Sequence, residues 1–218
     1  MNDSPVSEAT ARVDLGALLR GSGEMLRDRQ FVGYVLPIGF AFAINFGMLA
    51  GVPFILQDRL GFSPREFGLL VLMSMGGFSA GTLANNRLIG RVAPAIIVRR
   101  AGWCHVTALV VMAALSLSGF LAWWTIILPH VLLSFGTGIM TPTANAGAVS
   151  LYPRLAGTAS SWVGLAQMGI GALGTVTVAL LSLLDSRYVA MPLVVGLMPF
   201  AVASLLSARL LRPLTPRG

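Results

Sequence analysis

Charged residues are scarce in this sequence. Of its 218 residues, 11% are charged, against roughly 25% in an average soluble domain. Lysine is absent, so all 15 basic residues are arginine, and only 8 acidic residues oppose them. So few charges cannot cover the surface of a water-soluble protein of 22.9 kDa. A soluble globular protein is therefore excluded, and lipid is the expected solvent for most of the surface.

Cysteine and histidine are also rare. Cys104 is the single cysteine, which excludes a disulfide within the chain. The two histidines, His105 and His130, are too isolated for a metal site. We expect both to lie near membrane interfaces, where a hydrogen-bonded or snorkelling histidine is more common than a proton relay. No residue pattern indicates a bound metal or cofactor.

The formal net charge of +7 does not indicate a nucleic-acid-binding protein. Nucleic-acid interfaces gather basic residues in one patch or stripe. Here the arginines stand between long apolar runs instead. The positive charge is better explained by an anionic membrane surface.

Long uncharged runs make up most of the chain. Five of them hold 28, 20, 53, 30 and 21 residues and lie at 30–57, 67–86, 101–153, 155–184 and 188–208. About 20 apolar helical residues cross the hydrocarbon core of roughly 30 Å. The longest run therefore holds two crossings. Its natural break is at 119–124, where a glycine and the Trp123-Trp124 pair suit a turn at the membrane interface.

These runs predict an all-α, polytopic membrane protein. Transmembrane strands are not credible, because they show about ten residues of alternating polarity and these runs are apolar on all sides. The expected domain organisation is a six-helix transmembrane bundle at 31–211, followed by a cytoplasmic tail at 212–218. The six helices are expected at 34–56, 67–88, 101–121, 125–150, 160–184 and 189–210.

Residues 1–30 precede this bundle. They lack the basic start, apolar core and small-residue cleavage site of a signal peptide, because acidic residues are interspersed among the basic ones. We interpret them as a cytoplasmic, amphipathic, linker-like segment. A short helix lying on the membrane would gather an apolar face from Leu15, Leu18, Leu19, Leu26 and Phe31.

The placement of the arginines predicts the orientation. An even number of crossings puts both ends of the bundle on one side, and basic residues favour the cytoplasmic side. The two flanks and the loops after the second and fourth helices carry 12 arginines, whereas the opposite loops carry 3. Both termini are therefore expected in the cytoplasm.

Several short stretches resemble a known family. They are Gly33-Tyr34, Gly51-Val52-Pro53-Phe54, Phe67-Gly68, Asn145-Ala146 and, most specific, Pro153-Arg154-Leu155-Ala156-Gly157-Thr158-Ala159-Ser160. Together they resemble the carboxy-terminal half of Bcr/CflA-type drug-resistance transporters of the major facilitator superfamily. Such transporters have twelve helices in two halves of six, so this chain resembles one half.

The resemblance implies export of drug-like small molecules across a bacterial inner membrane, by proton antiport. In this family the membrane-embedded acidic residue and arginine linked to proton coupling belong largely to the other half. Consistently, Asp58, Glu66 and Asp185 are expected at helix ends. A partner is implied: a second copy, a separately encoded amino-terminal half, or the remainder of a longer protein of which this chain is a segment. The alternative is a non-transporting membrane subunit or truncated remnant that packs with other membrane proteins.

Uncharged polar residues inside the expected helices are the candidates for a substrate pathway, because polar groups in hydrocarbon need partners or water. Those in the fourth helix recur at spacings of three and four, which places them on one face. A pure packing role is the alternative for each candidate, and the pathway is favoured only for Asn145. The six candidates are Asn45, Ser134, Thr137, Thr141, Asn145 and Gln167.

The loop between the second and third helices is similar to a degenerate copy of the superfamily's cytoplasmic loop motif. Arg87 can lie at the negative end of the second helix, Gly90 permits a sharp turn, and Arg91 can face lipid phosphate. The motif's usual acidic residue is Asn85 here. Topology anchoring alone would also explain these arginines.

Two enzyme motifs occur by chance, and we do not expect an enzyme. Residues 77–81 match the Gly-x-Ser-x-Gly nucleophile elbow, and 169–174 match the dinucleotide-binding fingerprint. Both need a preceding strand, but each lies inside an expected membrane helix. Small residues there suit close helix packing, and in the fifth helix we assign this role to Gly164, Gly171 and Gly174.

Overall fold

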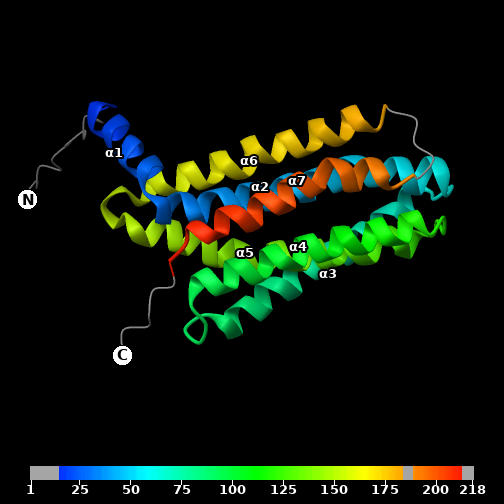
Figure 1. Cartoon of the computed structure of the whole chain (residues 1–218), viewed down its shortest axis with the longest axis horizontal. Helices are drawn as coiled ribbons and strands as arrows, with labels where there is room; N and C mark the ends of the chain where they lie inside the picture. Colours follow the sequence, from blue (N-terminus) through cyan, green and yellow to red (C-terminus); the bar gives the residue numbers. More distant parts are fainter. Residues whose placement is uncertain (1–14, 184–188, 213–218) are drawn as a thin grey trace, which may run out of the picture.

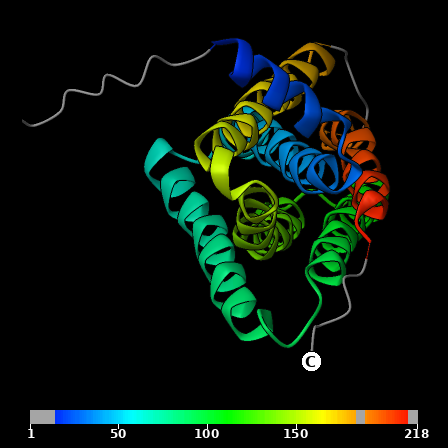
Figure 2. The same ribbon diagram turned by 90° about the vertical axis from the view of Figure 1, so that its left-hand side faces the viewer.

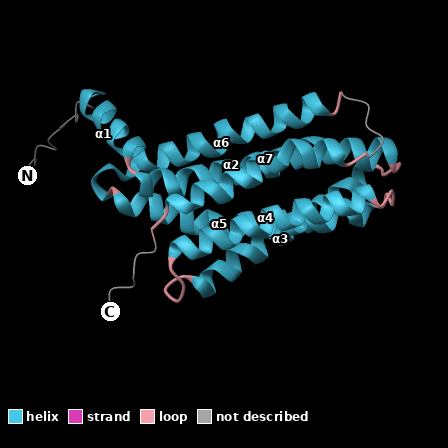
Figure 3. Cartoon of the chain, viewed as in Figure 1, coloured by secondary structure: helices cyan, strands magenta, loops and turns pink. Residues whose placement is uncertain are grey.

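The computed structural model describes residues 15–183 and 189–212, and every regular element in these ranges is a helix (Figure 3). The α-helices are α1 (Leu15–Arg27), α2 (Arg29–Pro53), α3 (Pro64–Leu88), α4 (Pro94–Leu117), α5 (Trp123–Leu151), α6 (Ala156–Leu181) and α7 (Met191–Ser207). A π-helical segment, η1 (Phe54–Arg59), continues α2. Short 3-10 turns, η2 (Pro153–Leu155) and η3 (Ala208–Leu210), precede α6 and follow α7.

The structure confirms six membrane-spanning helices. The spans run side by side along the long axis of the molecule, whereas α1 is set at an angle at one end (Figure 1). The longest uncharged run is divided between Leu117 and Trp123, as its glycine and tryptophans predicted. The spans are Arg29–Arg59, Pro64–Leu88, Pro94–Leu117, Trp123–Leu151, Pro153–Leu181 and Met191–Leu210.

Several helices begin earlier than the charge pattern predicted. α4 starts at Pro94 rather than at 101, and proline suits a first helical turn because its missing N–H needs no partner there. α2 starts at Arg29 rather than at 34, and Asp28 caps it by accepting a hydrogen bond of 2.8 Å from the Gln30 N–H. Charge gaps miss these turns, because an arginine near a helix end can reach the headgroups from inside the helix.

α1 lies against the end of the bundle formed by α2 and the α5–α6 connection. Its Met25 side chain is fully buried against the bundle, whereas Leu26 is 47% exposed and remains available to the membrane. A Cβ on Gly21 would lie 2.8 Å from the Leu155 side chain. The linker-like segment therefore includes a helix that contacts the bundle.

Burial differs sharply between the spans. Of the 18 most apolar consecutive residues in the span, 61% are buried in α2 and in α5, against 28% in α6 and 17% in α3. Viewed along the bundle, α2 and α5 lie towards the centre, and α3 stands at the edge (Figure 2). α3 and α6 therefore expose the most surface.

α6 packs on α2 along one row of residues. A Cβ on Gly39 of α2 would lie 2.7 Å from the Ile170 side chain and 3.0 Å from the Ala166 carbonyl oxygen. Further along the row, a Cβ on Gly174 would collide with the backbone of Ala43. The backbones thus approach so closely that only glycine fits at 174.

The three glycines expected to pack α6 against a neighbour do not behave alike. Gly174 lies against the α2 backbone, and Gly171 lies beside it, with a Cβ position 2.8 Å from the Phe46 ring. A Cβ on Gly164 would meet open space. Gly164 lies off the packed row, so the seven-residue spacing that aligned it with Gly171 did not identify a contact.

α3 packs on α5 through small residues. A Cβ on Gly77 would lie 2.7 Å from the Val131 carbonyl oxygen, and one on Gly81 would collide with the Phe135 carbonyl. From the other side, Gly138 faces the Phe78 backbone in the same way. The run at 77–81 is therefore a helix-packing surface inside α3, without the strand and strained turn that a nucleophile elbow requires.

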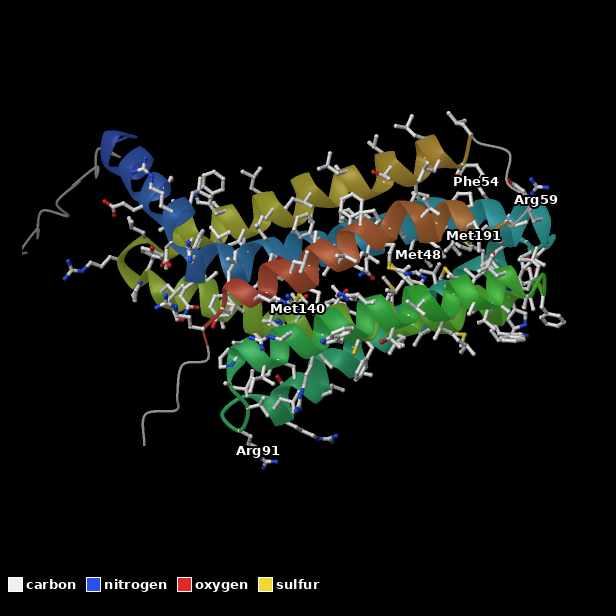
Figure 4. The ribbon with its side chains drawn as sticks, in the orientation of Figure 1. Met48, Phe54, Arg59, Arg91, Met140 and Met191 are labelled. Atoms are coloured by element: carbon white, nitrogen blue, oxygen red, sulfur yellow. The ribbon has the colours of Figure 1, made fainter. Side chains whose placement is uncertain are left out.

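Two apolar clusters form the core, one towards each end of the bundle. One contains Met140 and the other contains Met48, both labelled in Figure 4. On α5 the second cluster includes Leu133 and the first begins at Ile139. Between these two positions α5 carries two polar side chains, Ser134 and Thr137, and they form the centre of the candidate site.

Candidate functional site

A hydrogen-bonded polar group joins α2, α4 and α5 between the two apolar clusters. The Asn45 amide donates to the Thr137 hydroxyl oxygen at 2.6 Å and to the Ala41 carbonyl at 2.9 Å. The Ser134 hydroxyl donates to the Asn45 amide oxygen at 3.2 Å. His105 Nε2 lies 3.0 Å from the Thr137 hydroxyl. Asn45 was predicted on one helix and Ser134 and Thr137 on another, and the fold brings the three side chains together.

Ser134 and Thr137 face other helices of this chain. Their side chains are 4% and 2% exposed, whereas Asn45 is only partly buried. Burial in hydrocarbon makes each hydrogen bond between these groups matter, because no water replaces a lost partner. In this structure the two hydroxyls take part in hydrogen bonds that join α5 to α2 and α4.

The histidines lie in the interior, contrary to the expected interface position. His105 is fully buried and His130 is 6% exposed, with its Nδ1 atom 3.1 Å from the Ser74 hydroxyl. The hydrogen-bonded interpretation holds and the snorkelling one is wrong. His105 lies away from the helix end because α4 starts at Pro94, which places this residue well inside the helix.

Sequence reasoning missed the partnership of His105, although a signal was present. The buried α4 residues Val98, Ala101, Ala108 and Met112 recur at spacings of three and four, and His105 falls on the same row. A histidine on an apolar row of this kind needs an internal partner. Thr137 supplies it.

The remaining polar residues of α5 lie nearer its carboxyl end. Thr141 donates its hydroxyl to the Thr137 carbonyl of its own helix at 2.8 Å. The Gln167 amide of α6 donates to the Asn145 amide oxygen at 3.2 Å. Both amide side chains are only partly buried. This bond uses the oxygen of Asn145 and leaves its NH₂ group for another acceptor.

The α3–α4 connection has the turn that its sequence predicted. Arg87 lies in the last turn of α3, and Gly90 has a φ of +80°, the left-handed conformation that favours glycine. Arg91 is exposed. Asn85 is fully buried and accepts a hydrogen bond of 2.8 Å from the Thr143 hydroxyl. Its Nδ2 group has no hydrogen-bond partner within the part of the chain that the structure describes.

A polar contact fastens one end of the bundle. The Tyr152 hydroxyl donates to Asp28 at 3.0 Å, and its ring meets the Phe31 ring edge to face. Burial raises the pKa of Tyr152, and the hydrogen bond and negative charge of Asp28 raise it further. The contact joins the start of α2 to the α5–α6 connection.

Acidic side chains are confined to the ends of the described spans. Glu66 forms a capping box with Ser63 at the start of α3, and Asp58 lies in the last turn of η1. Asp185 lies outside the described residues. Among residues 15–183 and 189–212, no three His, Cys, Asp or Glu side chains gather as metal ligands would. The interior therefore offers uncharged hydrogen-bonding groups and two imidazoles.

Comparison with known proteins places this architecture. The family model described as Major Facilitator Superfamily matches residues 2–175. The chain is 26% identical over 163 residues to an uncharacterised MFS-type transporter, YdgK, of Bacillus subtilis, covering 73% of this chain and 39% of that protein.

Two further relatives carry multidrug names. The chain is 29% identical over 167 residues to the multidrug transporter MdfA of Edwardsiella ictaluri, covering 75% of this chain and 40% of MdfA. It is 37% identical over 75 residues to multidrug resistance protein D of Escherichia coli, covering 29% of this chain and 19% of that protein. The matched region spans no more than two fifths of the length of these relatives.

Proposed function

This chain belongs to the Major Facilitator Superfamily, and on that premise we propose that it forms part of a transporter that exports drug-like small molecules across a membrane. The multidrug names of its relatives support the substrate class. We further assign it to the Bcr/CflA type, as the carboxy-terminal half. Transport, not catalysis, is the activity that this family membership supports.

One observation carries the proposal: the Asn145–Gln167 amide pair joins two membrane spans and is only partly buried. Uncharged polar groups at the surface of a membrane helix are costly against lipid tails. They persist where they face water or another protein surface. We infer that this pair faces a substrate path and that its free amide groups contact the cargo.

We propose that a second six-helix body completes the path. The substrate site of transporters built from repeats lies between them. α3 and α6, the least buried spans, are the surfaces that such a body would cover. It is a second copy of this chain, or an amino-terminal half encoded elsewhere or in a longer form of the same protein.

We propose proton antiport as the energy source. The described spans hold carboxylates only at their ends. A proton-binding carboxylate near mid-membrane therefore belongs, on this proposal, to the second body. We further propose that the protein lies in a bacterial inner membrane with both termini in the cytoplasm. The orientation is supported by the arginines, because 12 of 15 lie on one side of the expected topology and basic residues favour the cytoplasmic side.

The test compares Asn145→Leu with Thr177→Val in cells that express the chain with its cognate half. Thr177 is a matched control because its hydroxyl bonds only the Leu173 carbonyl of its own helix, at 2.7 Å. We expect Asn145→Leu to lower drug export at least tenfold while the amount of folded protein, measured by size-exclusion chromatography, stays the same. Thr177→Val should change neither quantity.

Equal loss of export and of folded protein in Asn145→Leu would assign this residue to packing alone. Expression of the chain without a second half separates the two partners. Export by the chain alone favours a second copy. No export under any pairing would refute transport and favour a non-transporting membrane subunit.

A further inference from the structure

A crevice of about 470 Å³ lies between α2, the α3–α4 turn and α5. This volume falls in the usual range for small-molecule sites, roughly 300–1,000 Å³. The crevice is separate from the Asn145–Gln167 pair, neither member of which lines it. Its wall includes Tyr34, Arg91, Ile97, Thr143, Ala146 and Ser150.

The crevice opens at the level where spans end. α3 ends at Leu88, α4 begins at Pro94 and α5 ends at Leu151, and residues beside all three ends line the crevice. Helix ends of membrane spans lie where hydrocarbon gives way to headgroups. A ligand here would meet the lipid interface at the lip and apolar side chains within.

The hydrogen-bonding groups of the wall favour a ligand that accepts hydrogen bonds. The Thr143 hydroxyl already donates to Asn85, and the Ser150 hydroxyl donates to the Gly147 carbonyl at 2.9 Å. The Tyr34 hydroxyl and the Arg91 guanidinium remain as donors. Beside Thr143, the fully buried Asn85 amide also has a hydrogen without a partner among the described residues.

The charges around the lip favour an anion. Arg87, Arg91, Arg99 and Arg100 all lie on the turn or the helix ends that flank it, and the sequence holds no acidic residue between Glu66 and Asp185. Asp28, the N-cap residue of α2, already accepts hydrogen bonds from the Tyr152 hydroxyl and the Gln30 N–H. Cations would be repelled at this end.

We propose that the crevice binds an anionic phospholipid of the surrounding membrane. Arg91 extends from the turn away from the helices (Figure 4), where it can meet the phosphate outside the lip. The Tyr34 hydroxyl donates to an ester oxygen, and the first methylenes of an acyl chain lie against Ile97 and Ala146. A lipid satisfies the donors, the positive lip and the apolar wall together, whereas a free phosphate satisfies only the first two.

The test is a lipid titration of the purified full chain, followed by native mass spectrometry. Phosphatidylglycerol and phosphatidylcholine are compared, because both carry phosphate and only the first is anionic. The variants are Arg91→Gln, Tyr34→Phe and Ala146→Phe, which fills the crevice from an exposed position. Arg59→Gln is the matched control, since Arg59 is an exposed arginine at the opposite end of the bundle (Figure 4).

We expect the wild type to prefer phosphatidylglycerol. Arg91→Gln should weaken phosphatidylglycerol binding about tenfold, the effect of losing one charge-assisted contact. Ala146→Phe should weaken it by at least as much, because the ring occupies the space of the acyl chain. Tyr34→Phe should weaken it less, and Arg59→Gln should leave it within twofold. Equal losses of binding in Arg59→Gln and Arg91→Gln, or no loss in either Arg91→Gln or Ala146→Phe, would overturn the proposal. Displacement of the lipid by excess inorganic phosphate would assign the site to a small anion and also overturn it.

Discussion

Replacing Thr137 by valine tests whether the polar group between the two apolar clusters holds the helices together. The substitution keeps the shape of the side chain and removes its hydroxyl. That oxygen accepts a hydrogen bond of 2.6 Å from Asn45 and lies 3.0 Å from His105 Nε2. Asn45 keeps two other bonds, to Ala41 and Ser134. His105 keeps no side-chain partner within the described residues: its Nδ1 atom has none, and beside Thr137 the ring meets only the Leu133 backbone.

The expected loss of stability follows from these partners. Hydrogen bonds between membrane helices contribute about 0.6 kcal/mol each on average. The loss of two of them should therefore lower the free energy of unfolding by at least about 1.2 kcal/mol. Leaving a buried polar group without a partner costs roughly 1–3 kcal/mol. Since His105 is fully buried, we expect the free energy of unfolding to fall by about 2 kcal/mol.

Thr141→Val is the control, because the Thr141 hydroxyl bonds only a carbonyl of its own helix. Its effect should stay below about 0.5 kcal/mol. Reversible unfolding in mixed micelles, titrated with sodium dodecyl sulfate, measures both variants. Adding His105→Leu to Thr137→Val should recover part of the loss by removing the unpaired imidazole. Equal effects of the two valine variants would refute this account.

Three further predictions concern other parts of the bundle. Gly174→Ala should lower the free energy of unfolding by about 1–3 kcal/mol, because the added Cβ collides with the α2 backbone. Gly164→Ala should leave the free energy of unfolding unchanged or raise it, because the added Cβ meets open space. Ser63→Ala removes the cap of α3 and should cost about 1 kcal/mol in the same unfolding assay. Absorbance titration should place the pKa of Tyr152 above its usual value of about 10, and Asp28→Asn should lower it. Because the folded state favours the neutral phenol, the stability from this contact is complete below that usual value and is lost as pH rises through the raised pKa; an unshifted pKa would contradict the contact.

The sequence was sufficient to predict the number of spans, because the cost of burying charge in hydrocarbon leaves a visible pattern of gaps. The glycine at 119 also indicated the boundary inside the longest gap. The structure has a turn there, and Gly119 adopts a left-handed φ of +74° between the two helices. Helix ends were less predictable. Proline and flexible arginine side chains allow a helix to continue beyond the apolar run that marks it.

Partners across helices could not be predicted from periodicity. The spacing of Ser134, Thr137, Thr141 and Asn145 predicted a common face of one helix but did not indicate that Asn45 and His105 bond to Thr137. Which helices become neighbours depends on the whole bundle. The same limit explains Gly164, which shares a face with Gly171 but has no neighbour on it.

Within the described spans, every hydrogen bond that joins side chains of two membrane-spanning helices has one end on α5. In chain order α5 follows α2, α3 and α4. The earlier spans thus leave the ribosome with Asn45, Ser74, Asn85 and His105 lacking their final companions. Assembly of the bundle must wait for α5, and a ribosome stalled before Trp123 would leave these helices beside the insertion machinery, loosely associated and open to degradation.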